Sequence, residues 1–210
     1  MAKVIKFPVV SAGKFGLRRV RRRKKNLEEY GQLNLFAKPD DAKIIDIGQL
    51  TGFFETALNV HDHSMDRASV LYKKAIEKEE NVSDSYCNLG IIESHKGNLA
   101  ASIDCFTKSL EKDPRHFESH FNLANLYADA SNLALAILHY QVAKEIMPED
   151  CNIYYNLALV YAIDGKYEES MASLNKYFEL IGDTVTDKEA EKLLVLLQST
   201  IGITGTQTKT

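Results

Sequence analysis

The stretches SYCNLG, SHFNLA and IYYNLA, which begin at Ser85, Ser119 and Ile153, decide the fold of this chain. Their starts are 34 residues apart, and each stretch places an asparagine directly before a leucine. A fixed period of this length is typical of repeat architectures, in which copies of one structural unit stack on each other. The sequence therefore predicts a repeat array.

The period divides much of the chain into three blocks, residues 83–116, 117–150 and 151–184. In each block, positions four, seven, eight and 11 share one face of a helix, and positions 17, 20, 21, 24 and 28 form a second stripe. A short turn separates the stripes, and in HKGN (95–98) and IDGK (163–166) a glycine stops the first helix. Small residues at positions eight and 20 let two helices approach closely. Each block is therefore predicted to be a helix, a tight turn and a second helix.

The recurring residues read YCNLG…S…F…P, HFNLA…Y…A…Y…P and YYNLA…Y…S…L. They resemble the tetratricopeptide repeat (TPR) family. The pattern departs from the family at Glu93, where an aromatic residue is usual, and at Gly182, which replaces a proline. The resemblance implies an all-α fold, a right-handed superhelical array of helix-turn-helix repeats with a C-terminal capping helix.

The predicted array extends beyond the three blocks at both ends. A degenerate repeat occupies residues 49–82, and Thr186 with Glu189 makes a capping box at the start of a cap helix over 186–200. The predicted division of the chain is a basic, disordered tail over 1–45, a TPR domain over 46–200 and a disordered tail over 201–210.

The asparagines at position six, Asn88, Asn122 and Asn156, lie roughly opposite the core stripe of the first helix. The resemblance implies that the first helices line a concave groove, along which these residues form a ladder. Since an asparagine side chain both donates and accepts, it can pair with both groups of a peptide backbone. The alternative is that the asparagines are common at this position and stay solvated. The other predicted groove residues are Cys87, Ile91, Phe121, Asn125, Tyr155 and Leu159.

The predicted groove positions carry no lysine or arginine, and Asp84, Glu118 and Asp129 are acidic instead. TPR domains that bind the acidic C-termini of chaperones use basic groove residues. We therefore expect a neutral or basic ligand segment and no carboxylate clamp.

The net charge of -3 conceals a basic start, because residues 1–25 carry ten Lys or Arg and no acid. The run RRVRRRKK (18–25) fits nucleic acid, an anionic membrane surface or an acidic partner, and it can equally lie against the acidic remainder of its own chain. Its charged residues are Arg18, Arg19, Arg21, Arg22, Arg23, Lys24 and Lys25.

A second motif follows this basic run. Gln32, Leu33, Asn34, Leu35 and Phe36 resemble the short peptide by which bacterial proteins bind the DNA polymerase sliding clamp. In the alternative interpretation, the apolar residues Leu33, Leu35 and Phe36 pack onto the first repeat. The clamp interpretation leads to an alternative function, a nucleic-acid-associated accessory factor.

Motifs of catalysis are missing from the sequence, since no Walker loop, GxSxG or HExxH pattern occurs. The pairs His61 with His63 and His116 with His120 lack a third ligand, and His95 and His139 are expected at the surface. We therefore expect no enzyme, no metal and no cofactor.

Three cysteines without a CxxC pair, and the lack of a long apolar run, predict a cytoplasmic protein without integral membrane insertion. The main functional prediction is an adaptor or scaffold that binds a peptide segment of another protein in the concave groove.

Overall fold

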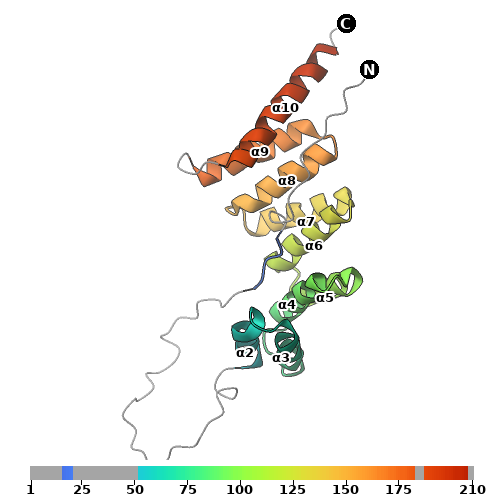
Figure 1. The fold of residues 1–210 in the computed structure, drawn as a ribbon, viewed down its shortest axis with the longest axis vertical. Helices are drawn as coiled ribbons and strands as arrows, with labels where there is room; N and C mark the ends of the chain where they lie inside the picture. Colours follow the sequence, from blue (N-terminus) through green and yellow to red (C-terminus); the bar gives the residue numbers. More distant parts are fainter. Residues whose placement is uncertain (1–15, 21–51, 183–186, 208–210) are drawn as a thin grey trace, which may run out of the picture. The chain divides into compact units, whose positions relative to one another are not determined.

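The computed structural model describes residues 16–20, 52–182 and 187–207. In these ranges the regular secondary structure is α-helical, and successive helices pack as pairs, α2 on α3, α4 on α5, α6 on α7 and α8 on α9 (Figure 1). The predicted all-α helix-turn-helix organisation is confirmed. The helices are α2 (Phe53–His61), α3 (Met65–Glu77), α4 (Val82–His95), α5 (Leu99–Lys112), α6 (Phe117–Asp129), α7 (Leu133–Ile146), α8 (Cys151–Ile163), α9 (Tyr167–Ile181) and α10 (Lys188–Gln207).

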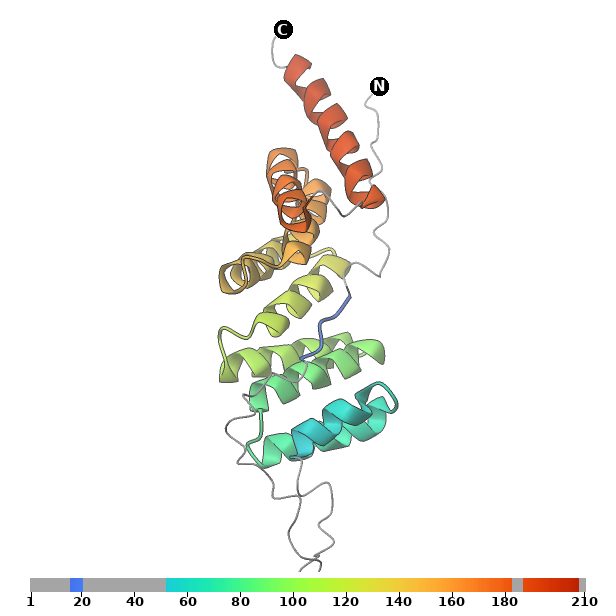
Figure 2. The ribbon, with the colours of Figure 1, turned by 90° about the vertical axis from the view of Figure 1, so that its left-hand side faces the viewer.

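The described residues form two compact units. The N-terminal unit contains residues 19–20 and 52–112, with α2 to α5, and the C-terminal unit contains residues 16–18, 113–182 and 187–207, with α6 to α10. Figure 2 shows the helices of each pair lying side by side. The predicted domain boundaries stay predictions.

Small residues bring the two helices of a pair together, as their spacing predicts. In the N-terminal unit, a Cβ added to Gly90 would lie 2.7 Å from the Phe106 ring, and the Ser102 hydroxyl donates to the Gly90 carbonyl at 2.7 Å. In the C-terminal unit, the Ser170 hydroxyl donates to the Ala158 carbonyl at 2.6 Å. Each small residue therefore serves both close packing and a buried hydrogen bond.

The turns between α4 and α5, between α6 and α7 and between α8 and α9 each contain one residue with left-handed backbone. Gly97 has a φ of 79° and Gly165 a φ of 77°, a conformation that glycine adopts without a steric penalty. In the middle block Ser131 takes this place with a φ of 58°. The two predicted glycine turns are confirmed, and the middle turn uses the same backbone geometry with a less suited residue.

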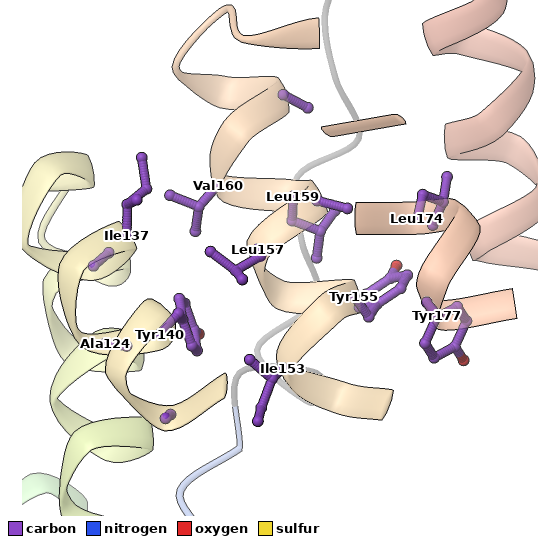
Figure 3. Close-up of a cluster of buried hydrophobic side chains, with 14 of the residues drawn as sticks. Ala124, Ile137, Tyr140, Ile153, Tyr155, Leu157, Leu159, Val160, Leu174 and Tyr177 are labelled. Atoms are coloured by element: carbon purple, nitrogen blue, oxygen red, sulfur yellow. The ribbon is translucent and has the colours of Figure 1, made fainter. Parts of the chain in front are cut away.

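The C-terminal unit has a continuous apolar core in which α8 lies between two neighbours. Figure 3 shows Leu157 and Val160 of α8 facing α7, while Tyr155 and Leu159 face Leu174 and Tyr177 of α9. α10 adds three fully buried side chains to this core, namely Ala190, Leu193 and Leu197. Helix α8 is therefore buried on several faces, which a single apolar stripe would not produce.

The start and the end of α10 differ from the prediction. The side chain of Asp187 accepts hydrogen bonds from the N–H groups of Glu189 and Ala190 at 3.0 and 3.1 Å, so Asp187 caps the helix. Thr186 lies outside the described residues. The helix continues to Gln207, past the predicted end at residue 200, because no proline follows and Gly202 weakens a helix without ending it. No described helix has the length and hydropathy needed to cross a membrane.

Candidate functional site

The three ladder asparagines are buried, which contradicts the alternative interpretation in which they stay solvated. Asn88 and Asn122 are 0% exposed and Asn156 is 1% exposed. A buried amide side chain needs hydrogen-bond partners, because an unpaired polar group loses its bonds to water. The next question is therefore which groups pair with these amides.

In the C-terminal unit, Asn122 pairs with both backbone groups of Arg18. The Arg18 N–H donates to Asn122 Oδ1 at 2.6 Å, and Asn122 Nδ2 donates to the Arg18 carbonyl at 2.9 Å. Asn125, one turn further along α6, donates from Nδ2 to the Gly16 carbonyl at 3.3 Å. Contacts at every second residue are typical of an extended backbone. The chain's own residues 16–18 thus contact α6 as an extended segment.

The Arg18 side chain enters a site made of two aromatic rings and a carboxylate. Its guanidinium donates through both Nη atoms to Asp150, with Nη2 2.8 Å from Oδ1. Its Cζ lies 4.5 Å from the Phe121 ring centroid and 5.4 Å from the Phe117 centroid, within the range of cation–π attraction. We call Phe117, Phe121 and Asp150 the arginine site.

Local structure fixes the carboxylate of the arginine site. Asp150 is the N-cap of α8, and its Oδ1 accepts a hydrogen bond from the Asn152 N–H at 3.0 Å. An acidic N-cap is stabilised by the exposed N–H groups and the dipole of its helix. The carboxylate is therefore held by its own helix as well as by Arg18.

The N-terminal unit repeats the backbone pairing with a different side chain. The Val20 N–H donates to Asn88 Oδ1 at 3.1 Å, and Asn88 Nδ2 lies 3.4 Å from the Val20 carbonyl that accepts from it. Arg19 donates from Nη1 to Asp62 Oδ1 at 2.6 Å, although the Asp62 side chain is 74% exposed. Val20 itself is buried. Backbone pairing by a position-six asparagine is thus common to both units.

Asn156, the third ladder residue, has a different set of contacts. Its Nδ2 donates to Asn125 Oδ1 at 3.4 Å, and that oxygen also accepts from the Tyr140 hydroxyl. Burial raises the pKa of Tyr140 well above its ordinary value, which keeps the hydroxyl protonated and able to donate. Among the described residues, Asn156 Oδ1 has no hydrogen-bond partner. A buried acceptor therefore lies next to the asparagine that binds Gly16.

The remaining predicted groove residues are buried in their own units. The Tyr155 and Tyr177 ring centroids are 5.2 Å apart, and Leu159 belongs to the same core (Figure 3). Cys87 and Ile91 are buried in the N-terminal unit. The structure thus brings Phe121 and Asn125 to the segment 16–18, and it shows Tyr155 and Leu159 as core residues.

The histidines depart from the prediction at one position. His139, expected at the surface, is only partly exposed, and its Nδ1 lies 3.0 Å from His120 Nδ1. Because His120 Nε2 faces the Pro114 carbonyl at 3.1 Å, His120 donates there and accepts from His139 at Nδ1. Burial and the neighbouring His120 lower the pKa of His139 to about 4. The pair is therefore neutral near pH 7.

Sequence reasoning missed two residues of the arginine site, and it gave contact of the basic run with its own acidic chain only as an alternative, which Arg18 on Asp150 bears out. Phe117 and Asp150 stand at the first and last positions of the middle block, whereas the predicted groove residues lie near the centres of the first helices. An aspartate just before a helix is a recognisable N-cap signal, but that signal says nothing about a ligand. The residues that do form the site come together only in three dimensions.

The structure leaves several of the predicted residues undescribed. Among the described residues, no group of three or more His, Cys, Asp and Glu side chains is arranged to hold a metal ion. Of the basic run, the structure describes Arg18, Arg19 and Val20. The residues outside the described ranges are Arg21, Arg22, Arg23, Lys24 and Lys25 of the basic run and Gln32, Leu33, Leu35 and Phe36 of the clamp-like motif.

Comparison with known families settles the class of repeat. Models described as tetratricopeptide repeat match residues 71–104, 105–137 and 152–184, and the first two matches begin 34 residues apart. The chain is a tetratricopeptide repeat protein. Such repeats stack into extended surfaces that bind other proteins, so this TPR protein is a protein-interaction scaffold.

Solved structures agree with this fold. The MamA chain from Desulfovibrio magneticus RS-1 that starts at residue 41 is 19% identical, with a TM-score of 0.63 over 80% of this chain and 92% of that chain. A thermophilic TPR protein of Thermus thermophilus is 17% identical, with a TM-score of 0.52 over 71% of this chain and 81% of that chain. At these identities the likeness concerns the fold alone. No curated protein matches the sequence.

Proposed function

We propose that this TPR protein is an adaptor that binds an extended peptide segment of a partner protein through its ladder asparagines. The observation that supports the proposal is the paired contact of Asn122, which donates to and accepts from the backbone of Arg18. Asn88 contacts the backbone of Val20 in the same way. In this proposal, residues 16–20 occupy the place of a partner segment.

A second observation that supports the proposal is the unsatisfied side-chain oxygen of Asn156. Its buried Oδ1 has no partner among the described residues, and an unsatisfied buried acceptor costs about 1–3 kcal/mol. An N–H group of a bound peptide would remove that cost. The same position of the repeat is thus satisfied by backbone in two blocks, and in the third its buried oxygen lacks a donor among the described residues.

The strength of backbone pairing limits what the asparagines contribute. A net hydrogen bond contributes about 0.5–1.5 kcal/mol, whereas micromolar binding needs about 8 kcal/mol. Because every peptide has the same backbone groups, this pairing holds a segment without reading its sequence. The side chains of the partner must supply the remaining affinity and the selectivity.

The experiment has to separate an added peptide from the chain's own segment, because both would use the same asparagines. We would use an open variant, the full chain with residues 16–20 replaced by Gly-Ser-Gly-Ser-Gly. Without this change, an asparagine substitution would weaken the internal and the added segment together, and the two effects would cancel in the measured affinity.

The probe is a fluorescent peptide with the sequence of residues 14–22, and its binding to the open variant is followed by anisotropy. Replacing Asn88, Asn122 and Asn156 by alanine should weaken binding at least about tenfold, which corresponds to about 1.4 kcal/mol. The matched control is Asn175→Ala, at an exposed position of α9. Unchanged affinity in a triple variant that retains its helical circular dichroism would contradict the proposal.

A further inference from the structure

We propose that the arginine site selects an arginine side chain of the partner segment, and that Arg18 fills this site in the unbound chain. The inference rests on the proposed function and adds the chemical class of the ligand, an extended basic segment. The ladder asparagines would bind its backbone. The arginine site would bind one of its side chains.

The geometry of the site matches arginine more closely than lysine. The two Nη donors of Arg18 meet the two oxygens of Asp150, a forked contact that an ammonium group does not make. The same group lies over Phe121 and near Phe117, a contact that arginine makes more often than lysine. The carboxylate therefore favours the forked donors of a guanidinium, and the rings favour its cationic face.

Partial burial strengthens the ion pair between Arg18 and Asp150. The Asp150 side chain is 12% exposed and the Arg18 side chain 27% exposed, so water screens this ion pair less than it would screen a surface pair. A neutral side chain in the same place would leave the carboxylate shielded from water and without a cation, at the cost of an unpaired charge. The site therefore discriminates against neutral residues as well as against lysine.

Because Arg18 occupies the arginine site, the chain's own segment competes with a partner segment for that site. A partner segment gains access to Asn122 and to the arginine site only when residues 16–18 leave them, since both use the same atoms. The apparent affinity for any partner is then reduced by the fraction of molecules in which the site is filled. Only partners that supply an arginine regain the contacts that are lost on displacement.

The test compares four peptides of residues 14–22 on the open full-length variant, with the residue equivalent to Arg18 as arginine, lysine, citrulline or alanine. Citrulline keeps the planar shape and removes the charge. We expect the lysine peptide to bind at least about threefold more weakly, and the citrulline and alanine peptides at least about tenfold more weakly. As a matched control, citrulline at the position of Arg19 should change the affinity less than about twofold.

The outcomes separate this inference from the proposed function. Equal binding of all four peptides, while the triple asparagine variant still loses binding, would overturn the arginine site and leave the backbone ladder standing. Failure of every peptide to bind the open variant would overturn both proposals.

The internal competition has its own measurement on the full chain with its native residues 16–20. The arginine peptide should bind Arg18→Ala at least about threefold more tightly than it binds the unaltered chain, while Arg115→Ala, a change at an exposed arginine, should leave binding unchanged. Equal affinity for the unaltered and the Arg18→Ala chains would overturn the internal competition.

Discussion

Arg18 and Arg19 are neighbours in the sequence, each pairs with an aspartate of the repeats, and their surroundings differ. Arg18 belongs to the C-terminal unit, where it forks onto Asp150 and lies over aromatic rings. Arg19 belongs to the N-terminal unit, where it meets Asp62, whose side chain is 74% exposed. Both arginines thus pair with an aspartate. Of the two, Arg18 also makes a forked contact and lies over aromatic rings.

Charge complementarity alone therefore does not define a recognition site. An ion pair that water surrounds contributes about 0–1 kcal/mol, because its Coulomb energy is screened and two long side chains lose freedom. Arg18 forks onto a carboxylate that is only 12% exposed and lies over aromatic rings, so its contact gains from fixed geometry as well as charge. We therefore assign selectivity to the position of Arg18 and general attraction to the position of Arg19.

The largest predicted difference comes from neutralising the two aspartates. In the open variant, Asp150→Asn should weaken binding of the arginine peptide by about ten- to a hundredfold, in line with the loss of a partly buried charge pair. Asp62→Asn should weaken it by less than about twofold. Fluorescence anisotropy on both variants checks the prediction, and similar losses in the two would remove the distinction between the arginines.

A smaller effect concerns His61 of the N-terminal unit, whose Nδ1 lies 3.0 Å from the Tyr72 hydroxyl. Burial, with a further contribution from Arg19, lowers the pKa of His61 to about 4. Arg19→Gln should therefore raise the pKa of His61, by less than about one unit, because burial remains. NMR titration of the histidine measures it, and an unchanged pKa would show that Arg19 does not lie near His61.

The same pKa has a consequence for stability with a definite sign. Because the folded-state pKa of His61 lies below the ordinary value of 6.5, the folded chain favours the neutral ring. Its contribution to the free energy of unfolding is complete above pH 6.5 and is lost as the pH falls toward 4. Denaturant unfolding of the unaltered chain and of His61→Gln at pH 7 and pH 5 measures it. Equal pH dependence in both would contradict the assignment.

The smallest predicted effect is that of salt on the Arg19 contact. Screening at high ionic strength weakens exposed charge pairs more than less exposed ones. Raising salt from about 0.05 to about 0.5 M should therefore remove the small advantage of arginine over citrulline at the Arg19 position, while the preference at the Arg18 position persists. Loss of both preferences at high salt would mean that the arginine site acts through general attraction alone.

The regular part of the fold was predictable because it depends on local spacing. The period of 34 located the helix pairs, and small residues such as Gly90 and Ser102 marked the close approach of two helices. The ability of asparagine to pair with a backbone follows from its side chain. These features need no knowledge of which distant residues come together.

The parts that sequence reasoning missed depend on distant contacts. A basic run has no periodicity that would indicate where it lies, so the contact of Arg18 with Asp150 was not predictable from either stretch. The burial of His139 depends on His120 and Tyr127 of the neighbouring helix. The N-cap role of Asp150 was readable in the sequence, whereas its role toward Arg18 required the fold.

Amide hydrogen exchange at Arg18 and Val20, measured by NMR on the full chain, tests the central claim most directly. The account predicts that both amides are protected, that Asn122→Ala removes protection at Arg18, and that Asn88→Ala removes protection at Val20. Asn175→Ala should change neither amide. Exchange of both amides at the unprotected rate in the unaltered chain would show that the asparagines do not hold this segment, and would contradict the account.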